Sequence, residues 1–179
     1  MGEVKSSLEI ALERAEAMSS GDKGEEEREQ GRRKGQIIAR KVLAGDLDPK
    51  QGAGEISALS GAERQGAAQT MVEHLMAKLQ EQAPLAFPAL AELLDAAAVQ
   101  KLEQVLAEMT SAGDGELAKL GDELGKEFAA LGLSGSALRP NPLSHPQAEA
   151  RLKAVLSPVA GRLQEAKAEV LRSLAPDAG

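Results

Sequence analysis

The amino-acid sequence predicts an all-α protein, a multi-helix bundle with an N-terminal helical arm or hairpin. Two observations lead to this prediction. Apolar residues recur along the chain at steps of three and four residues, which is the period of an amphipathic helix. No segment shows the alternation of apolar and polar residues, enriched in β-branched side chains, that is typical of a strand. We expect residues 1–45 to form the arm or hairpin and residues 46–179 to form the bundle.

Residues 3–19 form the first predicted helix, because their apolar side chains follow one seam. The steps along this seam alternate between four and three residues, as in two helices that pack side by side. The seam consists of Val4, Leu8, Ala11, Ala15 and Met18. The run Ser19-Ser20-Gly21-Asp22 then interrupts the pattern, and we expect the helix to break there.

The next stretch, residues 22–36, carries so much charge that we predict a solvated and frayed helix. Three glycines interrupt it, namely Gly24, Gly31 and Gly35. Each of them weakens a helix by up to about 1 kcal/mol relative to alanine. Apolar residues return over residues 37–43, which we expect to form one helix face ending near Gly45.

The same charged stretch contains the basic run Arg32, Arg33 and Lys34, which is a candidate interaction site. Concentrated positive charge would suit an acidic partner or a phosphate. The glutamates between residues 25 and 29 precede this run and cancel its charge locally. The alternative is a solvated helix of mixed charge, which is the usual role of such blocks.

Capping residues mark the next two helix starts. Asp48 suits an N-cap and Pro49 the first helical position, so we predict a short helix over residues 51–59. Ser60 and Glu63 have the spacing of a capping box, which predicts that another helix begins there.

Prolines and glycines divide the rest of the chain. Pro84 should end one helix and Pro88 should open the next, which would stop at residues 111–113. Asp114 should cap a further helix, which Gly132 closes.

Three more features concern the C-terminal half. Gly121 and Gly125 stand one turn apart, and by analogy with small-residue pairs in membranes we place a tight helix crossing there. Residues 133–146 form a proline-rich loop. The last helix, residues 147–174, has coiled-coil spacing, and Pro158 either kinks or splits it.

The composition removes most kinds of chemistry. The chain has two histidines, no cysteine, no tryptophan, no tyrosine and two phenylalanines. It therefore offers no disulfide, no thiolate metal site and no cysteine nucleophile. A net charge of −7 opposes nucleic acid and anionic lipid as partners. We predict no catalytic residue, no cofactor, no metal, no nucleic-acid or membrane partner, and a cytoplasmic location.

The two histidines do not fit a di-metal site in a helical bundle. Such a site needs a Glu-x-x-His pair on two helices and a further glutamate on each of two others. His74 has Met71 and Ala77 at the three-residue offsets, and the residues at those offsets from His145 are not glutamates either. The sequence therefore predicts no metal centre of this kind.

An acidic pocket on the central helices is the alternative that the sequence leaves open. Acidic residues are plentiful there, and the candidates are Asp95, Glu103, Asp122, Glu123 and Glu127. A small-molecule-binding protein or a helical enzyme would need several of them turned into one concave site.

Two segments resemble a family of small uncharacterised bacterial helical proteins. The first is Gly2-Glu-Val-Lys-Ser-Ser-Leu-Glu-Ile-Ala-Leu-Glu-Arg-Ala15, and the second is Gly135-Ser-Ala137 followed by Pro140-Asn141. The resemblance covers about a fifth of the chain. It implies a bacterial, cytoplasmic protein and carries over no catalytic residue.

These observations predict a non-enzymatic interaction or scaffold protein that self-associates. The seams of residues 3–19 and of residues 147–174 are the candidate surfaces, because an isolated short helix is only marginally stable in water and must pack against another element.

Overall fold

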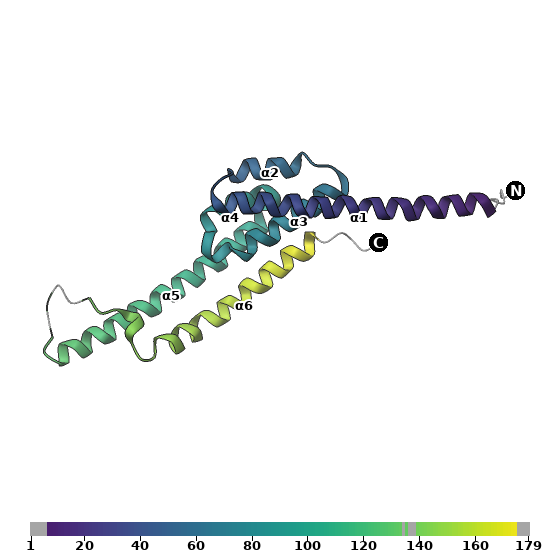
Figure 1. Cartoon of the computed structure of the whole chain (residues 1–179). Coiled ribbons are helices and arrows are strands. Elements are labelled where there is room, and N and C mark those ends of the chain that lie inside the picture. Colours follow the sequence, from purple (N-terminus) through teal and green to yellow (C-terminus); the bar gives the residue numbers. More distant parts are fainter. Residues whose placement is uncertain (1–6, 134, 136–138, 175–179) are drawn as a thin grey trace. The chain divides into compact units, whose positions relative to one another are not determined.

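The prediction of an all-α fold is confirmed. The computed structural model describes residues 7–133, 135 and 139–174, with side chains from residue 23 onward, and no strand occurs among them. The elements are α1 (Ser7–Ala44), α2 (Pro49–Ser57), α3 (Gly61–Ala77), α4 (Leu79–Leu93), α5 (Ala96–Ala130), the short 3-10 helix η1 (Pro142–Ser144) and α6 (Ala148–Leu174). Figure 1 shows them in sequence colours.

The helices form two compact units. The first contains α1 to α4, through Asp95, and the second extends from Ala96 to Arg172 and contains α5, η1 and most of α6. The sequence predicted a different division, at residue 45.

Three glycines bring α1 into backbone contact with α3. A methyl group added at Gly31 would lie 2.0 Å from the carbonyl oxygen of Glu63, and one added at Gly35 would lie 2.3 Å from that of Ala67. In the other direction, a methyl group at Gly66 would lie 2.3 Å from the carbonyl oxygen of Arg28. Only glycine permits this approach, so the expectation that Gly31 and Gly35 belong to a frayed, solvated helix is wrong.

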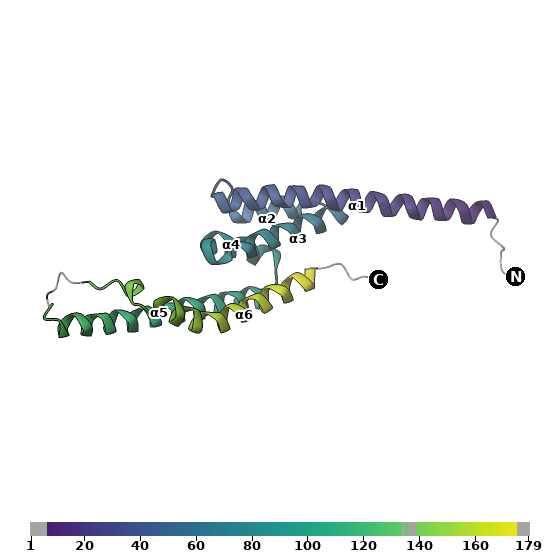
Figure 2. The same cartoon turned by 60° about the horizontal axis from the view of Figure 1, so that its bottom comes forward.

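The backbone of α1 is one continuous helix of 38 residues. The break that we predicted at residues 19–22 does not occur, because the polar residues there do not forbid helical backbone and the glycine penalty is small. Figures 1 and 2 show the N-terminal half of α1 continuing past α2, α3 and α4 of the same unit.

The short helix α2 begins as predicted. The Asp48 carboxylate accepts hydrogen bonds from the backbone N–H groups of Lys50 (2.9 Å) and Gln51 (3.2 Å), and Pro49 occupies the first turn. Ile56 is 1% exposed, and Ala53 is buried beside it. Both predictions, the N-cap and the proline, are confirmed.

The helix that follows starts where predicted, but without the capping box. Ser60 is the N-cap residue of α3, yet its side chain makes no capping hydrogen bond. The chain turns at Lys78 and again at Gln82, whose backbone is not helical (φ −135°, ψ 36°). All four helices contribute to the apolar core of this unit, and its largest fully buried side chains are Ile56, Met71, Leu75, Met76, Leu79 and Leu90.

Of the two prolines in α4, Pro84 acts as predicted and Pro88 does not: α3 ends at Ala77 and the backbone breaks at Gln82, both before Pro84. Pro84 follows the irregular residue Gln82 and so lies in the first turn of the regular helix, where the missing N–H costs little. Pro88 lies inside α4, which continues to Leu93 instead of beginning there. The break falls at Leu94 and Asp95, which precede α5.

Helix α5 also runs through the stop predicted at residues 111–113 and the start predicted at Asp114. The tight crossing predicted at Gly121 and Gly125 is wrong. A methyl group at Gly121 would meet only the Pro142 ring, at an ordinary 3.5 Å, and one at Gly125 would have no neighbour within 4 Å. Gly132, with φ of +76°, ends the helix as expected.

Helix α6 is continuous, so Pro158 does not split it. It runs antiparallel to α5, as both views show (Figures 1 and 2). Ion pairs join the two helices along their length: Lys101 with Glu169, Glu108 with Arg162, and Arg151 with both Glu116 and Glu123. The second unit is therefore a single layer of two long helices, to which η1 is added.

Candidate functional site

Glu116 is the only charged residue that is buried among the described residues, with 6% of its surface exposed. Arg151, on α6, donates from Nε to its Oε1 at 2.6 Å and from a terminal nitrogen to Glu123 Oε2, also at 2.6 Å. Lys119, one turn along α5, lies 3.3 Å from the other oxygen of Glu116. One guanidinium thus bridges two carboxylates of the facing helix.

His145 completes the cluster from the loop before α6. Its Nδ1 accepts a hydrogen bond from the backbone N–H of Gln147 at 3.1 Å, and its Nε2 lies 3.6 Å from Glu123 Oε2. Only 10% of its side chain is exposed. The cluster therefore ties α5, α6 and the intervening loop together.

The electrostatics of the cluster favour its charged form. The hydrogen bonds from Arg151 hold the pKa values of Glu116 and Glu123 below their ordinary values, against the opposing effect of desolvation. The same two carboxylates raise the pKa of Arg151. Charge is balanced among fixed partners, as in an ion-pair network that supports structure.

We expect the second unit to lose stability in acid because of this cluster. The two carboxyl pKa values are lower in the folded chain, so their stabilising effect is complete above the unfolded value of about 4.3 and is lost as the pH falls through the folded values. Thermal unfolding, followed by circular dichroism between pH 7 and pH 2, measures this loss of stability. In Arg151→Met the acid dependence should become shallower and the stability at pH 7 lower. Lys126→Met, an exposed site on α5, is the control, and equal acid slopes in both variants would contradict the assignment.

The sequence did not indicate this cluster. Glu116 and Arg151 are 35 positions apart, and neither belongs to a local motif. The only usable signal was the glutamate at an apolar position of the α5 stripe, four residues before Leu120.

The basic run that the sequence singled out is neutralised within the first unit. Arg32 pairs with Glu25 and Glu29. Arg33 pairs with Glu29, and Lys34 pairs with Glu63 of α3 at 2.7 Å. Of the N-terminal seam, Val4 and the side chains of Leu8, Ala11, Ala15 and Met18 lie outside the described residues.

The acids proposed for a pocket do not come together. Asp95, Glu103, Asp122 and Glu127 are exposed, and Glu123 is half-buried and bound to Arg151. Over the described ranges, no group of three or more histidine, aspartate and glutamate side chains is arranged to hold a metal ion.

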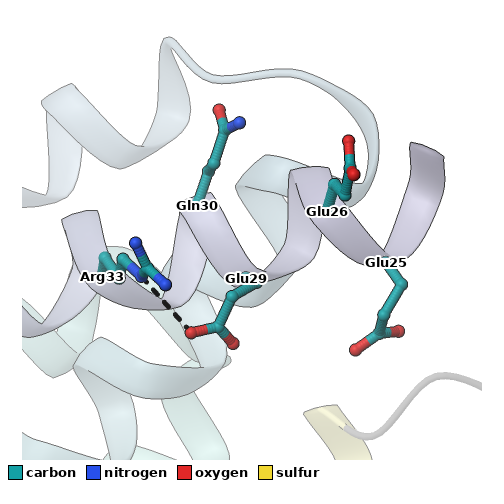
Figure 3. A pocket seen from close by; sticks show the side chains of 5 residues that line it. All are labelled: Glu25, Glu26, Glu29, Gln30 and Arg33. Atoms are coloured by element: carbon teal, nitrogen blue, oxygen red, sulfur yellow. Dashed lines mark hydrogen bonds and ion pairs between the residues drawn. The ribbon is translucent and has the colours of Figure 1, made fainter. Parts of the chain in front are cut away.

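The surface hollows do not make a ligand site either. One is lined only by residues of α1, and Figure 3 shows the side chains of Glu26 and Gln30 diverging from those of Glu25 and Glu29. A second, between α5 and α6, is lined by Val105 and Ala166 together with the ion pairs of Lys101 and Arg162. Neither gathers unpaired polar groups of one kind.

The apolar stripes of the second unit are only partly buried. Several large apolar side chains of α5 and α6 stay half-buried: Leu106, Met109, Leu117, Phe128, Leu152, Val155, Leu156 and Leu171. A helix normally buries such a stripe against a further layer. Within this unit, the described residues supply only one layer.

Comparison with family models, with curated proteins and with solved structures finds no match for this chain. The bacterial family resemblance stays a prediction. None of the described helices combines the length and the apolar character that a membrane span needs.

Proposed function

We propose that the protein is a non-enzymatic interaction protein that self-associates through the apolar face of the α5–α6 hairpin. One observation carries the proposal: two long helices form a single layer, and their stripes keep half-buried leucine, valine and phenylalanine side chains. Two such hairpins packed face to face would make a four-helix arrangement, in which each stripe is covered.

The chemistry of the hairpin supports this use. Its ion pairs lie along one edge of the helix pair, on Lys101 and Glu108 of α5 and on Arg151 and Arg162 of α6. On α6, half-buried Ala160 lies nearly half a turn around the helix from Arg162, so the ion pairs do not cover that side of the helix. The seam of residues 3–19 is a second candidate surface, and it stays a prediction.

Light scattering after size exclusion tests the proposal with a matched pair of variants. Ala160 is half-buried on the apolar side of α6, whereas Ala154 is exposed on the far side. We expect Ala160→Glu to raise the dissociation constant of the dimer by about tenfold or more, because each copy would bury an unpaired carboxylate. Ala154→Glu should leave it unchanged.

Two outcomes would contradict the proposal. One is a full-length chain that is monomeric at every concentration. The other is equal behaviour of Ala160→Glu and Ala154→Glu. A chain that lacks residues 1–21 keeps the α1–α3 contact, which begins near Arg28, so it shows separately whether the N-terminal seam contributes.

A further inference from the structure

A lysine interrupts the apolar stripe of α6. Lys167 lies four residues after Leu163, which is fully buried, and four residues before Leu171, which is half-buried. Residues four apart share a face of a helix. Lys167 is itself half-buried, and no described carboxylate pairs with it.

Burial without a partner is unfavourable for an ammonium group. Desolvation lowers the pKa of Lys167 below its ordinary value, and no neighbouring charge opposes this effect. A cation in such a position inside an associating helix face commonly selects the partner and the register, because only a carboxylate placed opposite it removes the cost.

The same helix carries the matching acid. Glu149 is exposed in the first turn of α6 and has no partner among the described residues. Lys167 follows it by 18 residues, which is about five full turns, so both lie on one face. Leu156 and Ala160 lie between them on that face, whereas the midpoint, Pro158, is about two and a half turns from each and faces the opposite side.

This arrangement is self-complementary. Glu149 and Lys167 are equally far from the midpoint, and so are Leu156 and Ala160. If two copies of α6 lie antiparallel about a two-fold axis at that point, each glutamate faces a lysine and each leucine faces an alanine. A two-fold interface requires such reciprocal pairs. The small alanine also lets the helices approach closely where the leucine of the other copy fills the space.

We propose that α6 pairs with α6 of a second copy in antiparallel orientation, with Lys167 of each copy bound to Glu149 of the other. This inference rests on the proposed function and names the partner and the orientation. The pairing would lie on the side of α6 away from the edge where Arg151 and Arg162 bind α5.

Charge reversal tests it. In Lys167→Glu two glutamates face each other at both contacts, and in Glu149→Lys two lysines do. We expect each single variant to raise the dissociation constant of its homodimer by about tenfold. The double variant should regain the affinity of the unaltered chain. An equimolar mixture of the two single variants should form a heterodimer, because both of its contacts then join opposite charges.

Control variants distinguish the antiparallel pairing of α6 from self-association of the α5–α6 hairpin in general. Glu165→Lys reverses an exposed charge on the far side of α6 and should change nothing. If neither the double variant nor the mixture restores association, while Ala160→Glu still dissociates the dimer, the antiparallel pairing is wrong and the proposed function stands. A variant that failed to fold would also fail in the mixture, and circular dichroism of each variant identifies that case.

Discussion

Gly35→Ala is expected to force α1 away from α3 and to lower the free energy of unfolding of the first unit by about 2–3 kcal/mol. The added methyl group would lie 2.3 Å from the carbonyl oxygen of Ala67 and 2.9 Å from its Cα atom. Both are backbone atoms, so no side-chain rotation relieves the contact. The helices must separate, and the side chains buried beside the crossing, Ile38 and Ala39, would then lose contacts.

Gly24→Ala in the same helix is the matched control. A methyl group there would have no neighbour within 4 Å, so only helix propensity changes, and the variant should gain up to about 1 kcal/mol. Urea unfolding followed by circular dichroism measures both. Equal stabilities for Gly24→Ala and Gly35→Ala would mean that the helices do not approach at this crossing.

The second large effect concerns α2. Ile56→Ala should lower the free energy of unfolding by about 2–4 kcal/mol, because Ile56 is 1% exposed and its loss leaves a cavity. The helix has little stability of its own, since it has nine residues and contains Gly52 and Gly54. Packing therefore holds α2 in place. In Ile56→Ala, the backbone amides of α2 should lose their protection from hydrogen exchange before those of α3.

Hydrogen exchange, resolved by peptide, measures this local loss together with the global unfolding. Ser57→Ala changes the neighbouring exposed residue, so it leaves the cavity unformed and should keep the protection of α2. If Ile56→Ala kept that protection as well, the Asp48 cap and the backbone hydrogen bonds would be sufficient to hold the helix.

The sequence predicted correctly two helix ends that depend only on residues that are close together in the chain. Asp48 caps α2 and Gly132 ends α5, because an N-cap acceptor and a residue with positive φ satisfy needs within a few residues. The glycines were misread because their role depends on distance to another helix. Gly31 and Gly121 look alike in sequence, yet only Gly31 has a carbonyl oxygen of α3 against it.

The charged cluster of α5 and α6 could not be predicted from the sequence for the same reason, because it depends on contacts between two helices. The sequence placed Glu123 in a candidate pocket with four other acids, whereas the structure pairs it with Arg151 and brings in Glu116, which was not considered. Partners 28 and 35 positions apart follow from the register of α5 against α6, and no periodicity in one helix reveals that register. The stripe of α6, in contrast, follows from spacing alone, and it carries the proposed self-association.

The order of charges along the α5–α6 edge has a consequence for how the chain reaches its native alignment. Lys101 and Glu108 are one heptad apart, and their partners Glu169 and Arg162 are also one heptad apart with the opposite signs. Leucine and valine stripes that repeat every seven residues would tolerate slippage of one helix by a heptad. If α6 slipped by one heptad along α5 in one direction, Lys101 would face Arg162. If it slipped by one heptad in the other direction, Glu108 would face Glu169. Repulsion of like charges thus discourages the competing alignments that the apolar pattern alone would allow.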